Sequence, residues 1–277
     1  MNSVPKKFDV KTLKFDRVYL TIGCRESGKT TLMQHLYTEL TNQYQQFYKS
    51  DNEVENEHKD IIAVSNRNAL RSWSRLPRTK ETQAEIGLGW HDPKVNTLIQ
   101  SQSSIVDKHL ETIPGDDGRS FVPLRVVVAD DVFNVDKKLI QGRTVHELLM
   151  NGRILKTALF VGTQTTREMP GWFRTNVDYV FLHGNNNLFF QKKAYEEFFG
   201  MFNSFDEFQA AFEEIRKTHP RAVMVVDNTN GHRTLEETVF WYDPYDDVEP
   251  AWDIVALTCH SCGQVVSEKR SADEMEK

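Results

Sequence analysis

The chain has 277 residues, a formal net charge of −6 at pH 7 and a pI near 5.9. This length suits one large α/β domain with a small appendage, and the acidic average excludes a protein that binds nucleic acid through a uniformly basic surface. Three cysteines cannot form a disulfide framework and are typical of a reducing compartment. No apolar run is long enough to span a membrane, and no signal-peptide core follows the N-terminus, so we expect a soluble intracellular protein.

The N-terminal segment, residues 1–16, carries apolar side chains that we expect to pack against the domain that follows. These side chains are Phe8, Val10, Leu13 and Phe15. The domain itself is expected to cover residues 17–245, and residues 246–277 read as a polar C-terminal tail.

A phosphate loop follows the apolar run at residues 18–22. It fits the pattern G-x-x-x-x-G-K-[ST] at every fixed position with Gly23, Cys24, Arg25, Glu26, Ser27, Gly28, Lys29 and Thr30. Glycines at both ends permit a turn whose backbone N–H groups wrap an anion at the N-terminus of the next helix. We therefore expect these residues and Thr31 to bind ATP, with Lys29 on the β- and γ-phosphates and the Thr30 hydroxyl on Mg²⁺.

The helix after the loop is expected to dock on a sheet, because Leu32, Leu36 and Leu40 recur every four residues and form one apolar stripe. A short strand is predicted next at residues 61–64.

Residues 67–80 are locally basic. They contain Arg67, Arg71, Arg75, Arg78 and Lys80 with no acidic residue among them. The first three arginines are four apart, so on a helix they would form one stripe, and Pro77 must end that helix. Such a stripe in an acidic protein is a candidate contact for a double-stranded DNA backbone. A solvated helix face whose arginines pair with acids elsewhere would have the same sequence.

Two carboxylates, Asp130 and Asp131, end the apolar run at residues 124–131. The carboxyl ends of parallel strands gather at one edge of a sheet, so we expect Asp130 beside the phosphate loop, where it can hold Mg²⁺ through water. Asp131 is placed to orient or deprotonate the attacking water. The alternative is a strand end capped by turn-forming aspartates. Gln164 ends the next apolar run and could hydrogen-bond the γ-phosphate or the water as a sensor.

The remaining segments alternate between strand and helix patterns. In chain order we predict a loop at 81–93, a helix at 95–113, a turn at 114–118, helices at 144–155 and from 169, a strand at 177–182, an aromatic helical stretch at 188–212 that serves packing, and a strand pair at 222–227 and 238–242. This alternation predicts an α/β fold with a mostly parallel sheet covered by helices on both faces.

The tail contains Cys259 and Cys262, spaced like half of a zinc site. A closed structural zinc site takes four ligands, and the chain has no second cysteine pair. His260, His232 or a neighbouring subunit would have to complete it.

With these motifs in this order, the sequence resembles the DNA-packaging ATPases of poxviruses and other large nucleocytoplasmic DNA viruses, a branch of the FtsK/HerA class of P-loop DNA translocases. The resemblance runs from about residue 18 to residue 242 and rests on GCRESGKT, VVVADD, MNGRILKTALFVGTQ, FRTNVDYVF, VMVVDNT and VFWY. It implies a RecA-like core that works as a homo-oligomeric ring and hydrolyses ATP to move double-stranded DNA into a preformed capsid. A capsid or portal protein would be its partner, in the host cytoplasm at virus assembly sites or in the virion.

Residue by residue, the resemblance assigns the same roles to Lys29, Thr30, Asp130, Asp131 and Gln164 as the motifs do. In the family's Gly-Arg-His segment the chain keeps Gly152 and Arg153 but has Ile154 at the histidine position. Arg153 and Arg174 are both candidates for an arginine that reaches the γ-phosphate of a neighbouring subunit, and the sequence does not choose between them.

Two other classes share a phosphate loop. A nucleotide kinase would need an arginine-rich lid for its acceptor, which residues 67–80 could supply, and steady ATP turnover without an acceptor would argue against it. An ATP-gated scaffold protein would show slow turnover that DNA does not change.

Overall fold

The computed structural model describes residues 4–47, 59–76, 84–112, 122–167, 169–229, 231 and 234–246, with the side chains of 45–47 and 109–112 left aside. The turn predicted at 114–118, the cysteine pair and nearly all of the predicted tail lie outside these residues. The chain divides into two compact units, residues 1–242 and 243–277, and the architecture below is that of the first. None of the described helices combines the length and hydropathy that a membrane span requires.

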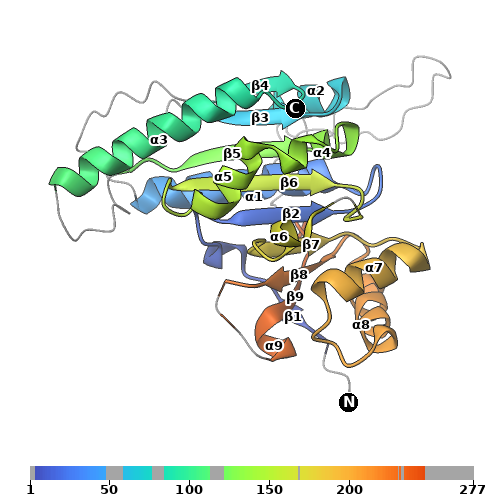
Figure 1. The fold of residues 1–277 in the computed structure, drawn as a ribbon. Helices are drawn as coiled ribbons and strands as arrows, with labels where there is room; N and C mark the ends of the chain where they lie inside the picture. Colours follow the sequence, from blue (N-terminus) through green and yellow to red (C-terminus); the bar gives the residue numbers. More distant parts are fainter. Residues whose placement is uncertain are drawn as a thin grey trace, which may run out of the picture. The chain divides into compact units, whose positions relative to one another are not determined.

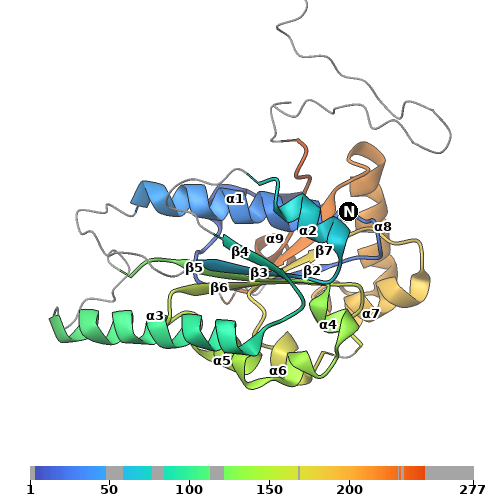
Figure 2. The same ribbon diagram turned by 90° about the horizontal axis from the view of Figure 1, so that it is seen from above.

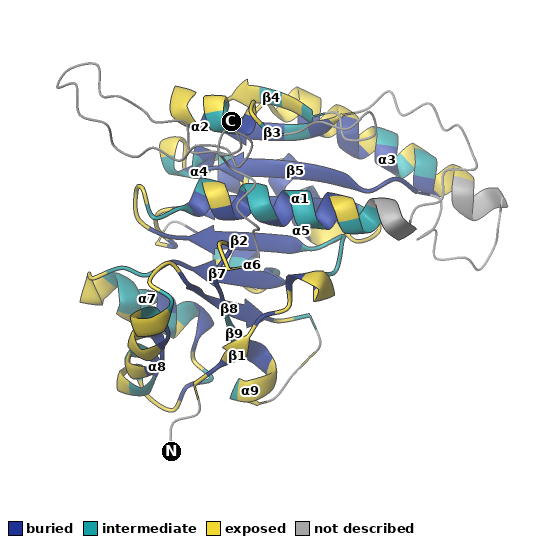
Figure 3. Ribbon diagram, turned by 180° about the vertical axis from the view of Figure 1, so that it is seen from behind, coloured by how far each residue is buried: buried dark blue, intermediate teal, exposed yellow. Residues whose placement is uncertain are grey.

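A nine-stranded sheet forms the centre of this unit (Figure 1). In spatial order its strands are β1 (Lys6–Lys7), β9 (Val239–Tyr242), β8 (Val223–Asp227), β7 (Tyr179–Leu182), β2 (Val18–Ile22), β6 (Thr157–Thr163), β5 (Arg125–Asp130), β3 (Asp60–Val64) and β4 (Ala84–Leu88). Strand β8 runs antiparallel to both of its neighbours, and the other pairs are parallel. Every residue of β2, β5, β6 and β7 is buried, as expected for strands covered on both faces (Figure 3).

Helices cover both faces of the sheet. The helices are α1 (Lys29–Phe47), α2 (Arg67–Trp73), α3 (Asp92–Thr112), α4 (Val132–Val135), α5 (Arg143–Asn151), α6 (Gly171–Arg174), α7 (Leu188–Phe198), α8 (Phe205–Thr218) and α9 (Leu235–Thr238). Short 3₁₀ turns lie at Val10–Thr12 and Leu139–Gln141. Helices α1 and α2 lie on one face, and α3, α5 and α6 lie on the other (Figure 2). The α/β fold with a mostly parallel sheet is therefore confirmed.

The apolar layer under α1 is built by the stripe predicted from the sequence. Leu32, Leu36 and Leu40 are fully buried there. Phe8 and Leu13 of the N-terminal segment join the same layer, which confirms the expected packing role of that segment. Since α1 follows the phosphate loop directly, this layer anchors the loop to the sheet.

Three predicted elements differ from the structure. The segment predicted as a loop at 81–93 contains β4, an edge strand that pairs with β3 in parallel from Asp60–Ala84 onward; its residues are mostly exposed, so no apolar run marks it. Helix α2 ends at Trp73, which leaves Arg75 beyond the helix. The stretch 188–212 is two helices, because α7 ends at Phe198 and a new helix, α8, begins after Ser204. Ser204 caps α8 by accepting a hydrogen bond from the Glu207 N–H at 3.2 Å.

Candidate active site

Five neighbouring strands end at one edge of the sheet and deliver polar residues there. Strands β7, β2, β6, β5 and β3 lie in this spatial order. They are followed in turn by His183, Gly23, Gln164, Asp131 and Ser65. The carboxyl ends of parallel strands are where α/β proteins bind ligands. The fold thus brings the phosphate loop, the carboxylates and Gln164 together, as the strand pattern predicted.

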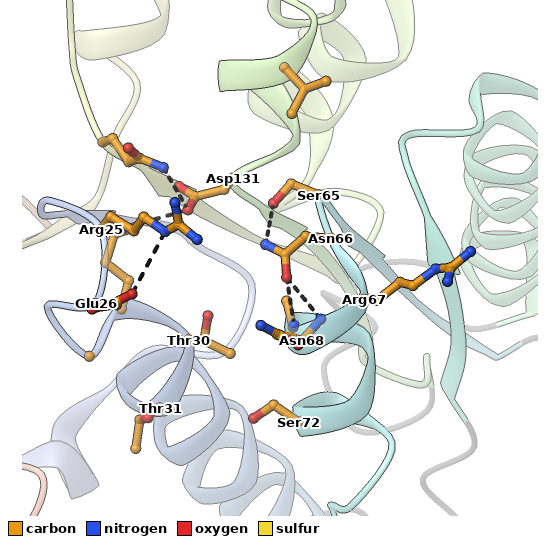
Figure 4. Close-up of a pocket in the computed structure, with 15 residues that line it drawn as sticks. Arg25, Glu26, Thr30, Thr31, Ser65, Asn66, Arg67, Asn68, Ser72 and Asp131 are labelled. Carbon is orange, nitrogen blue, oxygen red and sulfur yellow. Dashed lines mark hydrogen bonds and ion pairs between the residues drawn. The ribbon is translucent and has the colours of Figure 1, made fainter. Parts of the chain in front are cut away.

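The phosphate loop is closed tightly around its first glycine. A Cβ atom at Gly23 would lie 2.3 Å from Oγ of Ser27 and 2.8 Å from Cβ of His183, so only glycine fits. Gly28 has a φ of +96°, a conformation that glycine adopts at little cost. Two of the x positions point outward: Arg25 and Glu26 form an ion pair at 3.8 Å with both side chains more than four-fifths exposed (Figure 4).

Lys29 begins α1 and is buried within the loop. Its Nζ donates hydrogen bonds to the carbonyl oxygens of Gly23 and Cys24, both at 3.0 Å, and lies 3.5 Å from Oδ2 of Asp131. The ammonium therefore lies between the phosphate loop and Asp131, the residue that follows β5, where it can neutralise an anion that the loop binds.

Thr30 and Asp130 form a close pair of oxygen ligands. The Thr30 hydroxyl donates to Oδ2 of Asp130 at 2.8 Å, and the indole Nε1 of Trp73 donates to the same oxygen at 3.0 Å. Burial raises the pKa of Asp130, an effect opposed by these two hydrogen bonds. Hydroxyl and carboxylate oxygens are the ligands that Mg²⁺ prefers, and both point to one place beside the loop, so the residues fit a magnesium ion.

Asp131 is held from three sides. Its Oδ1 accepts a hydrogen bond from Nδ2 of Asn134 at 2.8 Å, and its Oδ2 accepts one from Nε2 of Gln164 at 3.2 Å and faces Lys29. The residue has a φ of 57°, in the left-handed region, where Asp and Asn are among the few non-glycine residues found. The carboxylate is thereby fixed toward the phosphate loop.

A pocket of about 910 Å³ opens over these groups (Figure 4). Its lining comprises Arg25, Glu26, Gly28, Lys29, Thr30, Thr31, Ser65, Asn66, Arg67, Asn68, Ala69, Ser72, Asp131, Val135 and Gln164. Most of the predicted site residues are in this set. The residues from Ser65 to Ser72 extend the pocket along the start of α2, well beyond the loop itself.

The predicted DNA-contacting arginines lie on and beside α2. Arg67, Arg71 and Arg75 are all exposed. Arg67 lines the pocket, and in Figure 4 its side chain points away from Asp131. Because α2 ends at Trp73, Arg75 does not continue the helical stripe.

The two candidate arginines for a neighbouring subunit lie outside the pocket. Arg153 forms an ion pair with Asp178. The other carboxylate oxygen of Asp178 accepts a hydrogen bond at 2.9 Å from the N–H of Val18, which is the first residue of β2. Arg153 is therefore at the amino edge of the sheet, opposite the phosphate loop. Arg174 pairs with the buried carboxylate of Glu197 at 2.9 Å and lines a second pocket of about 640 Å³. The choice between them stays open.

Three residues near the site were not predicted from the sequence. Asn134 holds Asp131, Trp73 holds Asp130, and His183 packs against the glycines of the loop. Asn134 comes one helical turn after Asp131, a spacing at which side chains meet. A large buried tryptophan usually finds a hydrogen-bond acceptor, but nothing in the sequence says that the acceptor is Asp130.

A mostly parallel sheet with a phosphate loop after its central strand β2 defines the fold of the P-loop NTPases. In agreement, the DNA-packaging ATPase B204 from Sulfolobus Turreted Icosahedral Virus superposes with a TM-score of 0.50 at 16% identity, covering 84% of this chain and 99% of that one. The genome packaging NTPase B204 from Sulfolobus turreted icosahedral virus 2, in complex with AMP, gives a TM-score of 0.52 at 14% identity with the same coverage. At such identities the likeness shows the fold alone.

Sequence relatives are also viral. Uncharacterized protein L437 of Acanthamoeba polyphaga mimivirus is 28% identical over 154 residues, which are 55% of this chain and 52% of the relative. Uncharacterized protein 075L of Invertebrate iridescent virus 6 is 29% identical over 128 residues, 45% of this chain and 48% of the relative. The matched part is thus about half the length of these curated relatives. No family model matches the chain.

Proposed function

We propose that this chain is an ATPase that moves double-stranded DNA and packages a viral genome, working as a homo-oligomeric ring. The observation that carries the proposal is the convergence of Lys29, Thr30, Asp131 and Gln164 on one pocket, with Asp130 directly behind Thr30. This set contains a phosphate-binding cation, oxygen ligands for a metal, a carboxylate that can activate water and an amide that can sense a phosphate.

Each residue has a role that follows from its position. The loop amides and Lys29 bind the phosphates of ATP, and Thr30 and Asp130 hold Mg²⁺, which when bound neutralises charge on the β- and γ-phosphates. Asp131 orients the attacking water or takes its proton, since its carboxylate faces the loop and is fixed by Asn134 and Gln164. Gln164, whose side-chain amide donates a hydrogen bond to Oδ2 of Asp131, senses the γ-phosphate.

Support for the DNA and virus parts of the proposal comes from several sides. Arg67, Arg71 and Arg75 expose positive charge beside the pocket in a chain that is acidic overall. Solved structures of this fold include genome-packaging NTPases of viruses, and curated relatives come from a mimivirus and an iridescent virus. In a ring, Arg153 or Arg174 would complete the pocket of the next subunit.

The wider assignment belongs to the same proposal. Residues 17–245 form the ATPase domain, flanked by the segment 1–16 and the tail 246–277. A capsid or portal protein anchors the motor, at virus assembly sites in the host cytoplasm. FtsK/HerA membership rests on the resemblance of the motifs.

The test is ATP hydrolysis by the purified, assembled protein with and without linear double-stranded DNA, beside an Asp131→Asn variant. Asparagine tolerates the left-handed backbone at this position, so the variant removes the carboxylate charge and little else. We expect DNA to raise turnover, and the variant to bind ATP without hydrolysing it. Turnover that ignores DNA would contradict the motor, and turnover that requires an added phosphate acceptor would identify a kinase.

A further inference from the structure

Trp73 connects α2 to the carboxylate behind the phosphate loop. It is the last residue of α2 and its side chain is fully buried. Its Nε1 donates to Oδ2 of Asp130 at 3.0 Å, the oxygen that also accepts from Thr30. An indole N–H can only donate, and a buried donor without an acceptor is costly. Trp73 and Asp130 must therefore move together or lose this bond.

The rest of α2 is tied to the same region. Ser65, which leads into the helix, donates its N–H to the carbonyl oxygen of Asp130 at 3.0 Å. Ser72 and Gln34 of α1 exchange side-chain hydrogen bonds at 3.0 and 3.3 Å, and the ring of Tyr37, also on α1, packs edge-on against Trp73 with centroids 6.0 Å apart. One side of α2 is thus fastened to the nucleotide site.

The other side of α2 faces solvent. Arg67 and Arg71 are exposed there, and Arg75 follows just beyond the helix end. The seven residues of α2 form a short rigid body, since Asn66 caps its start by accepting from the N–H groups of Asn68 and Ala69 at 3.0 and 2.9 Å. A displacement of the arginine side is transmitted directly to the indole.

We propose that Trp73 is a positioning residue, which fixes the carboxylate of Asp130 and couples the position of α2 to the metal site. Two donors on one oxygen hold the carboxylate against rotation. Occupancy of the site and the state of α2 then bias each other, as any two coupled equilibria do. This inference rests on the proposed role of Asp130 as a magnesium ligand, and it gives the proposed DNA contact a physical connection to the nucleotide.

The first test is Mg²⁺ affinity in a Trp73→Phe variant loaded with the non-hydrolysed analogue AMPPCP, measured by calorimetric titration of the metal. We expect Mg²⁺ to bind about tenfold more weakly, the effect of one hydrogen bond to a charged group, while metal-free AMPPCP binds within about twofold of the unaltered protein. The matched control is Tyr37→Phe, which keeps the ring against the indole and removes another buried hydrogen bond of the same layer, the one that the Tyr37 hydroxyl donates to Asp60. Equal Mg²⁺ affinity in both variants would overturn the proposal.

The second test is hydrogen exchange of the α2 amides. In the unaltered protein, adding Mg²⁺ to the AMPPCP complex should slow exchange in residues 67–73 several-fold, and Trp73→Phe should abolish this change while α1 remains protected. The same protection in the variant would show that Trp73 only packs. If the variant does not fold, 3-benzothienylalanine at position 73 keeps the ring shape and replaces the N–H with sulfur. Neither measurement needs hydrolysis or DNA. The role of Trp73 is therefore tested independently of the motor proposal, which is tested by ATP turnover with and without DNA.

Discussion

Nε2 of Gln164 and Oδ2 of Asp131 lie 3.2 Å apart, and that oxygen is also 3.5 Å from Nζ of Lys29. One carboxylate oxygen therefore joins the residues that follow the neighbouring strands β6 and β5 to the first residue of α1, beyond the phosphate loop. A phosphate bound in the loop would compete for Lys29, and Asp131 would then depend more on Gln164 for its orientation. This arrangement makes the amide a sensitive point of the site.

Replacing Gln164 with alanine should lower the rate of ATP turnover roughly 100-fold, the typical effect of removing one hydrogen-bond donor from an active site. Nucleotide affinity should change little, because the phosphate loop and Lys29 are untouched. Steady-state kinetics and analogue binding separate the two effects. Gln141→Ala removes an exposed glutamine that does not line the pocket and should behave like the unaltered protein; equal rates for both variants would rule out the role of Gln164.

Adding a methyl group at Gly23 should disrupt the phosphate loop. In Gly23→Ala the new Cβ would collide with Ser27 and with Cβ of His183, so we expect a loss of about 1–3 kcal/mol in the free energy of unfolding and loss of ATP binding. Gly87→Ala is the control, because nothing lies within 4 Å of its new Cβ. Chemical denaturation and analogue titration measure both variants, and a Gly23→Ala protein that binds ATP normally would contradict the close packing.

The imidazole of His183 should lower the free energy of unfolding in mild acid. Burial, reinforced by the charge of Lys29, lowers the pKa of His183 from 6.5 to about 4. The unfolded chain takes up a proton near pH 6.5 and the folded chain does not, so this stability is complete above pH 6.5 and is lost as the pH falls toward 4. Between pH 7 and pH 5 the loss should be about 2 kcal/mol.

Urea denaturation at both pH values measures this loss, with His183→Asn as the reference. Burial raises the pKa of Asp60 and Asp130, which works in the opposite direction, and both carboxylates remain in the reference variant. The difference between the two proteins therefore isolates the histidine. Identical pH dependence would mean that the pKa of His183 is the same in the folded and the unfolded chain.

Neutralising Arg67, Arg71 and Arg75 together should flatten the salt dependence of DNA binding. Each lost phosphate contact lowers the slope of log K against log salt by about 0.9, so three contacts correspond to roughly 2.7. Changing Lys138, Lys192 and Lys217 to glutamine removes the same charge from three other exposed positions and should leave the slope nearly unchanged. If the two triple variants have equal slopes, the DNA contact lies elsewhere.

Mixing experiments should identify the arginine that acts on a neighbouring subunit. An alanine variant of that arginine should bind ATP without turnover, and adding Lys29→Ala subunits should restore part of the activity, because some interfaces then combine an intact loop with an intact arginine. Arg153 is 62% exposed and Arg174 is 31% exposed, and each pairs with a buried carboxylate. The greater exposure of Arg153 makes it the better placed of the two to reach out. Full activity of both alanine variants would exclude both.

The sequence by itself determined the phosphate loop, the order of strands and helices, and the carboxylates at the end of β5, because each depends on residues adjacent in the chain. The local apolar pattern predicts which residues follow a strand, and parallel pairing then brings Gly23, Asp131 and Gln164 to one edge. Edge strand β4 was missed because prediction relies on that pattern, and an exposed strand does not have it.

Only the tertiary structure decided which side chains support the site. Trp73 donates to Asp130, which lies 57 positions later in the sequence. His183, which follows β7, packs against Gly23 from the side of β2 opposite β6. Both contacts depend on the spatial order of β7, β2, β6, β5 and β3, which differs from their order in the chain. Strand order is set by the packing of the whole sheet, and that is why local pattern could not predict these partners.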